Sequence, residues 1–251
     1  MKFFFLFLAA FAGYNLSAQI VTDRPDQTES SATVGAGVLQ IETGFGFESL
    51  DVDKTGKSES WTLPNTLFRL GLSERWELRL VTQPELQREF TNDTLNSKRF
   101  GFADAQVGFK VNLVSGENRK TEVGFLAHLQ VPTGTDLISN HDGGFISKLA
   151  ITHTLNAKHS IAYNVGYDYL GMDNGDISYS LAWGIGLTGK VGVYAEVYGS
   201  LANLEELQSN VDFGFTYLFT PNVQFDYSFG YGLSQEMNYH AIGVSLKLEK
   251  G

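Results

Sequence analysis

The sequence of 251 residues contains no cysteine, only 5 proline residues and fewer basic than acidic residues, which gives a formal net charge of -10. Without cysteine, a disulfide, a thiolate nucleophile and a Cys-ligated metal are all excluded. The shortage of basic residues argues against nucleic acid as a partner, because no basic stripe could neutralise phosphates. After the first residues there is no long apolar run, so we expect no transmembrane helix.

The one unbroken apolar run lies at the start of the chain. Lys2 precedes the apolar stretch Phe3 to Ala12, which is too short to cross a bilayer as a helix. The small residues Ser17 and Ala18 then come before Gln19. This order predicts a cleaved secretory signal peptide over residues 1–18, with an N-terminal core strand as the alternative.

Most of the remaining chain alternates between apolar and polar side chains. Leu39, Ile41, Thr43, Phe45 and Phe47 alternate with polar residues or glycine. Successive side chains of a strand point to opposite faces, so each such strand separates two different environments. Segments of roughly ten residues with this pattern, separated by turn residues, are typical of transmembrane β-barrels. The 19 Phe and 11 Tyr residues favour the same fold, because aromatic girdles mark both membrane interfaces.

The fold class predicted from this pattern is all-β: a transmembrane, antiparallel, up-and-down β-barrel of about twelve strands. We expect a signal peptide over residues 1–18, a polar periplasmic or luminal leader over 19–37, and the barrel over 38–251. The expected strands are Val38–Leu50, Glu59–Leu72, Trp76–Gln87, Phe102–Val114, Thr121–Pro132, Gly144–Thr154, Ser160–Leu170, Ile177–Leu187, Val191–Leu201, Asn210–Phe219, Val223–Gly232 and His240–Leu248.

The expected connections alternate between short turns and mostly longer polar loops. Ser73–Arg75 and Thr220–Asn222 are short, whereas Glu85–Arg99 and Thr133–Gly143 are long and polar. Short periplasmic turns and longer outer loops are the usual asymmetry of outer-membrane barrels, and an even strand count places both ends of the barrel in the periplasm. The rival architecture is a soluble β-sandwich, whose strands also alternate but enclose an apolar core.

Charged residues of both signs occur on the polar faces of the expected strands. Two interpretations stay open: paired charges that brace a narrow lumen, or a constriction that selects solutes by charge and size. The pore-lining candidates are Glu42, Arg69, Glu77, Arg79, Asp104, Lys110, Glu122, Lys148, Glu196, Asp212 and Asp226.

Signals of an enzyme are weak. None of the five His residues forms a metal-ligand pair at helical spacing, and no Gly-x-Ser-x-Gly elbow marks a nucleophile. We therefore expect no catalytic residues, no metal and no cofactor. A Ser-His-acid site assembled across strands, as in an outer-membrane hydrolase, remains an alternative.

Several motifs carry a resemblance to a known family. The segment Thr22 to Ser30, which reads TDRPDQTES, resembles the opening motif of the outer-membrane proteins grouped as the putative MetA-pathway of phenol degradation family. Shorter matches follow in order up to Leu248: Glu77-Leu78-Arg79, Gly101-Phe102-Ala103-Asp104, Pro132-Thr133-Gly134, Tyr194-Ala195-Glu196 and Gly230-Tyr231-Gly232. The resemblance implies an outer-membrane β-barrel that acts as a transporter or channel for small compounds, among them hydrophobic or aromatic ones.

The sequence thus predicts a monomeric channel for passive uptake of small solutes in the outer membrane of a Gram-negative bacterium. Its expected partners are outer-membrane lipid and a small-molecule solute. A closed structural or surface-binding barrel is the alternative. The leader is hydrophilic and does not alternate, so we expect Asp23, Arg24 and Asp26 to enter the periplasmic mouth as a plug that narrows or gates the pore. A flexible tail is the alternative. Arg24 would pair with a luminal carboxylate such as Glu77 or Asp104, and Asp23 or Asp26 with Arg79 or Lys110.

Overall fold

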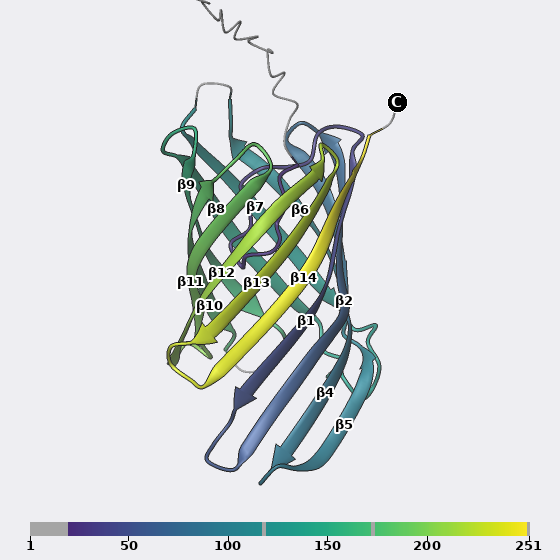
Figure 1. Ribbon diagram of the computed structural model, residues 1–251. Coiled ribbons are helices and arrows are strands. Elements are labelled where there is room, and N and C mark those ends of the chain that lie inside the picture. The colour runs from purple at the N-terminus through teal and green to yellow at the C-terminus, as the bar shows by residue number, and fades with distance from the viewer. Residues whose placement is uncertain (1–19, 117–118, 172–173, 250–251) are drawn as a thin grey trace, which may run out of the picture.

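The computed structural model describes residues 20–116, 119–171 and 174–249, so the predicted signal peptide over 1–18 lies outside the described residues. The described chain forms strands joined into one antiparallel sheet (Figure 1). The strands are β1 Leu39–Asp51, β2 Gly56–Ser73, β3 Trp76–Thr82, β4 Pro84–Thr91, β5 Thr94–Phe102, β6 Ala105–Val114, β7 Thr121–Val131, β8 Gly144–Thr154, β9 His159–Tyr169, β10 Asp176–Gly186, β11 Val191–Ala202, β12 Glu206–Thr220, β13 Val223–Gly232 and β14 Met237–Leu248.

The sheet closes on itself, because β1 pairs with β14 on one side and with β2 on the other. β3 and β4 both pair with β2, one after the other, so together they form a single wall strand interrupted at Gln83. β5 and β6 likewise form one strand, interrupted at Ala103 and Asp104. The result is a closed antiparallel barrel of 12 strands, which confirms the predicted fold class.

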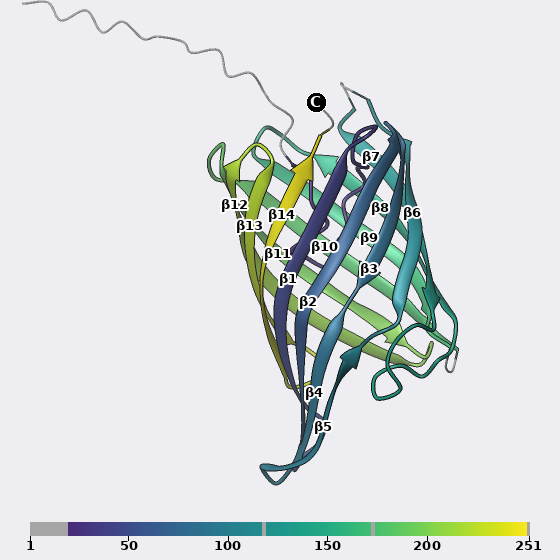
Figure 2. The same cartoon turned by 90° about the vertical axis from the view of Figure 1, so that its right-hand side faces the viewer.

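The segment Glu85–Arg99, predicted as a long polar loop, is instead most of the β4–β5 hairpin. Its two-residue turn, Asn92 and Asp93, has positive φ values of 48° and 60°, as in the tight turns that suit twisted hairpins. With the outer halves of β1 and β2, this hairpin projects beyond the barrel rim (Figure 2). A strand that leaves the membrane has water on both faces, which explains why its sequence does not alternate cleanly.

The faces of the barrel are inverted relative to a soluble protein. Large apolar side chains such as Phe45, Trp183, Phe215 and Phe225 are exposed on the outside. The buried interior holds more polar and charged residues than apolar ones among those the structure describes. The soluble sandwich is therefore ruled out, because its enclosed face would be apolar. Within the described ranges, no helix is long and apolar enough to cross a membrane.

The two ends of the barrel differ. One end carries the short turns β2–β3, β8–β9, β10–β11 and β12–β13, together with the C-terminal end of β14. We call it the periplasmic end, following the usual orientation of outer-membrane barrels. The other end, here the outer end, carries the projecting hairpin and the loop between β7 and β8 (Figure 1). The leader, drawn in purple, lies inside the barrel near the periplasmic end in both views (Figures 1 and 2).

Candidate functional site

The barrel interior contains every charged residue predicted to face the lumen. Asp104, Glu122 and Lys148 are partly buried, while the others are buried. Asp104 and Lys148 line a cavity at the outer end, and Glu122 accepts a hydrogen bond from Ser31 of the leader. The buried charged residues of this set are Glu42, Arg69, Glu77, Arg79, Lys110, Glu196, Asp212 and Asp226.

Three cations from adjacent strands form what we call the cationic wall: Arg69 on β2, Arg79 on β3 and Lys110 on β6. All three converge on one carboxylate of the leader, Asp23, at N–O distances of 3.3, 2.7 and 2.7 Å. Glu42 and Glu77 complete the cluster by pairing with Arg69, each at 2.9 Å. Charge-assisted bonds of this length are among the stronger interactions in proteins, so the cationic wall fixes the leader firmly.

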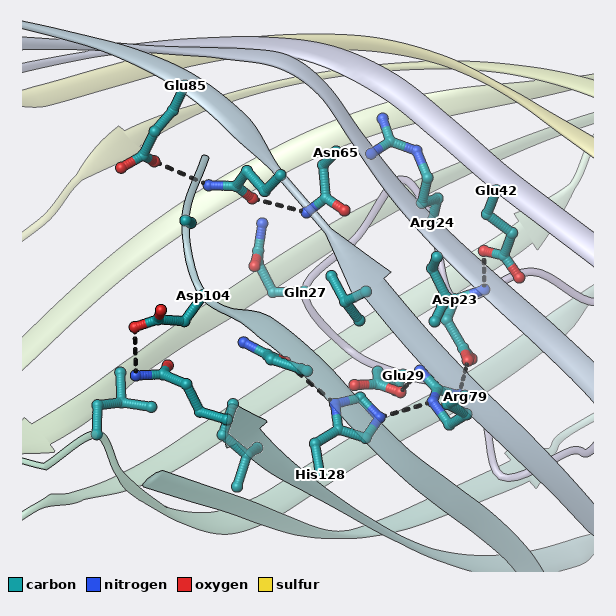
Figure 3. A pocket seen from close by; sticks show the side chains of 18 of the residues that line it. Asp23, Arg24, Gln27, Glu29, Glu42, Asn65, Arg79, Glu85, Asp104 and His128 are labelled. Carbon is teal, nitrogen blue, oxygen red and sulfur yellow. Dashed lines mark hydrogen bonds and ion pairs between the residues drawn. The ribbon is translucent and has the colours of Figure 1, made fainter. Parts of the chain in front are cut away.

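A second leader carboxylate, Glu29, also contacts the cationic wall. Its Oε2 accepts a hydrogen bond of 2.6 Å from Arg79, whose Nε donates to His128 at 2.9 Å (Figure 3). Burial raises the pKa of Glu29, but Arg79 and Lys110 outweigh it and lower the pKa to about 2. Burial likewise raises the pKa of Asp23, and the three cations more than offset it and hold the pKa well below its usual range.

Backbone groups of the leader are bound by side chains from around the barrel. Asn164 exchanges two hydrogen bonds with the backbone of Glu29, and Glu77 accepts one from the backbone N–H of Val34. A leader without secondary structure needs such partners, because an unpaired buried backbone group costs free energy. Sequence reasoning did not identify Glu29 or Asn164 as residues that position the leader.

The opposite side of the lumen carries what we call the acidic wall: Glu196 on β11, Asp212 on β12 and Asp226 on β13. Arg24 of the leader pairs here with Asp226, at 3.3 Å. The predicted pairing of Arg24 with Glu77 or Asp104 is therefore wrong. Glu77 is already paired with Arg69 and Arg79, and Asp104 accepts hydrogen bonds from the β7–β8 loop.

The two other leader acids behave differently from one another. Asp23 meets both Arg79 and Lys110, as the sequence predicted. Asp26 forms no ion pair with either among the described contacts, and faces the acidic wall instead. Burial and, next, the carboxylate of Glu196 raise the pKa of Asp26 well above its usual range. The leader therefore places one acid against cations and another against acids.

The leader divides the lumen into separate cavities. A cavity of about 640 Å³ lies on the outer side, between the leader, the β2–β3 and β6–β8 walls, and residues 138–140 of the β7–β8 loop. A cavity of about 440 Å³ lies on the periplasmic side, against the turns between β8 and β11 and the inner faces of β11 to β13. Arg24, Pro25 and Asp26 line both cavities, so we call these three residues the septum.

The outer cavity is covered in part by the β7–β8 loop. Asp104, at the interruption between β5 and β6, accepts hydrogen bonds from the backbone N–H of Gly134 at 2.8 Å and the hydroxyl of Ser139 at 2.7 Å. Most of the residues that line this cavity are polar or charged (Figure 3), with apolar side chains such as Leu67, Val81 and Ile146 among them. No group of three or more His, Asp or Glu side chains in the part of the chain that the structure describes could hold a metal ion.

A closed barrel with an apolar outer band, a polar lumen and an inserted leader defines the chain as a β-barrel of the outer-membrane type. A family model described as "Putative MetA-pathway of phenol degradation" matches residues 22–248, and the chain belongs to this family. The match begins within the leader, at the first residue of the motif that carried the resemblance. No curated protein matches the chain significantly.

Solved structures similar to this chain are outer-membrane barrels. An outer membrane channel from Pseudomonas putida F1 has a TM-score of 0.68 and 11% sequence identity, with 87% of this chain and 98% of that chain covered. The KdgM porin in complex with disordered oligogalacturonate has a TM-score of 0.56 and 8% identity, with coverages of 82% and 98%. The NanC porin has a TM-score of 0.51 and 13% identity, with coverages of 83% and 100%. At these identities the similarity shows the fold.

Proposed function

We propose that this chain is a non-enzymatic outer-membrane channel for passive uptake of small solutes, and that its leader closes the lumen in the conformation described. The observation that carries the proposal is the septum, where three leader residues separate an outer from a periplasmic cavity. A barrel that served only as a structural support would need no cavity on either side of an inserted segment. The solved channels and porins of similar fold support the same role.

The lining of the cavities bears on the kind of solute. Polar and charged side chains make up most of the walls of the outer cavity. Such walls favour solutes that can exchange their hydrogen bonds to water for hydrogen bonds to the wall. The proposal therefore covers small solutes in general, without the restriction to hydrophobic or aromatic compounds that the family name implies. We further propose export by the cleaved signal peptide of residues 1–18 to the outer membrane of a Gram-negative bacterium, and a monomeric barrel.

Deleting Thr22–Ser30 tests the proposal directly. In planar bilayers we expect the deletion to raise single-channel conductance several-fold, because the two cavities would join into one passage. The wild-type protein is the reference, and heat-modifiable migration on a gel shows that the shortened barrel is folded. A folded deletion variant with no conductance would refute the channel and favour the closed structural barrel.

A further inference from the structure

The acidic wall lies between the two ends of the lumen, at the level of the septum. On β11, Glu196 sits between Tyr194, which lines the periplasmic cavity, and Tyr198, which lines smaller cavities on the outer side. On β13, Asp226 is the next lumen-facing residue after Gln224, which lines the periplasmic cavity. A solute that passed the septum on this side would therefore pass directly over these carboxylates.

The carboxylates of this wall are incompletely paired. Glu196 and Asp212 stand directly opposite each other on β11 and β12, an arrangement of like charges that is unfavourable. Asp212 Oδ1 and Asp226 Oδ2 are buried and have no hydrogen-bond partner among the described residues. Buried acceptors normally have partners, so these two oxygens indicate a place for a further donor or cation. Within the described part of the chain, Arg24–Asp226 is the one ion pair that the acidic wall forms.

Arg24 occupies a seat made of three residues in a row across the sheet: Gly44 on β1, Gly243 on β14 and Asp226 on β13. A Cβ atom at Gly243 would lie 2.7 Å from both Nε and Nη2 of Arg24, so the missing side chain makes room for the guanidinium. The hold is weak, because the pair with Asp226 is a single contact of 3.3 Å and the buried Nε has no partner among the described residues.

The cationic wall leaves no comparable route. Arg79 alone bonds to Asp23, Glu29, Glu77 and His128. Displacing the leader there would separate several buried charges, and an unpaired buried charge costs several kcal/mol. Displacing Arg24 breaks one ion pair, and the buried carboxylate that it leaves, Asp226, is the group with which an entering cation would pair.

We propose that solutes cross the septum between Arg24 and the acidic wall, and that this crossing selects cations. The inference rests on the proposed channel function and names the charge class of its solute. In the closed state the guanidinium of Arg24 occupies the position of the passing cation, and a cation entering from either cavity replaces it at Asp226. Small ammonium, guanidinium or alkali-metal cations match the seat, whereas an anion would meet Asp226 beside the paired carboxyl groups of Glu196 and Asp212.

The test is the reversal potential of the full-length barrel in planar bilayers under a KCl gradient. We expect a K⁺ to Cl⁻ permeability ratio on the order of 5. Asp226→Asn should lower this ratio about twofold or more, because one of the carboxylates that face the cation is neutralised. Asp93→Asn, at the tip of the projecting β4–β5 hairpin, removes the same charge outside the lumen and should leave the ratio unchanged.

A second variant changes the space available to Arg24 without changing any charge. Gly243→Ala keeps every charge but places a methyl group 2.7 Å from the guanidinium and 2.8 Å from Asp226 Oδ1. It should therefore push Arg24 away from Asp226, raise the open probability several-fold and preserve cation selectivity. Guanidinium chloride at millimolar concentration should compete for the vacated seat and reduce the K⁺ current. Asp212→Asn, compared with the wild type at pH 9 where carboxyl groups are ionised, serves as a second charge variant if Asp226→Asn does not fold.

The outcomes distinguish this inference from the channel proposal. Anion-selective or non-selective openings would overturn the cation route while leaving a channel. A permeability ratio that neither Asp226→Asn nor Asp212→Asn changes would also overturn the cation route. The cation route would likewise be wrong if Gly243→Ala stayed closed while deletion of the leader opened the pore. No conductance in any variant, including the folded deletion of Thr22–Ser30, would refute the channel itself.

Discussion

The cationic and acidic walls of the lumen bind the same leader in different ways. On the cationic wall, Arg69, Arg79 and Lys110 all reach Asp23, and each of these cations has at least one further bond. On the acidic wall, carboxylates outnumber cations, and Arg24–Asp226 is the one ion pair that this wall forms within the described residues. Glu196 of the acidic wall also accepts hydrogen bonds from the backbone N–H of Gln27 and from the hydroxyl of Thr28. A segment fixed by several ion pairs on one side and held by fewer bonds on the other can open on that second side without leaving the barrel. The cationic wall therefore anchors the leader, whereas the leader opens along the acidic wall.

The largest effect is expected from removing the centre of the cationic wall. Arg79→Gln leaves Asp23, Glu29 and Glu77 without one of their shared cations in a buried site, and should lower the free energy of unfolding by about 3–5 kcal/mol. Urea unfolding of the barrel in lipid vesicles, followed by tryptophan fluorescence, measures this.

The matched control for that variant is Arg88→Gln. Arg88 lies on the projecting β4 strand, 35% exposed and 4.0 Å from Glu59, so its loss should change stability by only about 0–1 kcal/mol. Equal losses for the two variants would mean that the cationic wall is no stronger than a surface pair.

A smaller effect on stability is expected at the acidic wall. Arg24→Gln removes one contact of 3.3 Å with the buried carboxylate of Asp226 and should cost about 1–3 kcal/mol of unfolding free energy. The open probability should nevertheless rise clearly, because the septum no longer pairs with Asp226. If Arg24→Gln destabilised the barrel as much as Arg79→Gln, the two walls would not differ in the way described.

The smallest effects concern pH, and the two walls should give opposite signs. The pKa of Glu29 is lowered to about 2 by docking, so its contribution to docking is complete at neutral pH and is lost as pH falls toward that value. The pKa of Asp26 is raised by docking, so docking is strongest below the ordinary pKa of an aspartate and weakens as pH rises through the raised one.

Open probability measured from pH 3 to pH 9 tests both signs. Glu29→Gln should reduce the rise in opening on the acid side, and Asp26→Asn should reduce the rise on the alkaline side. A profile that neither substitution alters would show that these carboxyl groups do not control docking.

The barrel could be predicted from the sequence because the membrane imposes one rule on every strand. Leu39 to Phe47 alternates since lipid lies on one face and the polar lumen on the other. The β4–β5 hairpin escaped prediction because it leaves the membrane, where no apolar face is required. The turn residues Asn92 and Asp93 were the available signal, since Asn and Asp tolerate positive φ better than most residues.

The charged residues of the lumen could be predicted from the sequence, but the ion pairs that they form with the leader could not. Alternation places Arg79, Lys110 and Asp226 on the inner face, yet it says nothing of which leader residue each will meet. That depends on strand tilt and on the depth of the leader, both of which are properties of the closed barrel. Asp23 was assigned correctly to the cations, whereas Arg24 was assigned to the wrong wall.

The central claim is that the leader closes the channel by docking on the lumen wall, and a disulfide lock tests it most directly. The hydroxyl oxygens of Thr28 in the leader and Ser180 on β10 lie 2.7 Å apart, and the chain has no native cysteine, so Thr28→Cys with Ser180→Cys introduces a single thiol pair. The control pair is Thr43→Cys with Thr66→Cys, whose hydroxyls lie 2.8 Å apart between β1 and β2. We predict that oxidation silences the leader–wall variant, that reduction restores its openings, and that the control conducts equally in both states. Equal conductance of the leader–wall variant with its disulfide formed and reduced would contradict the account.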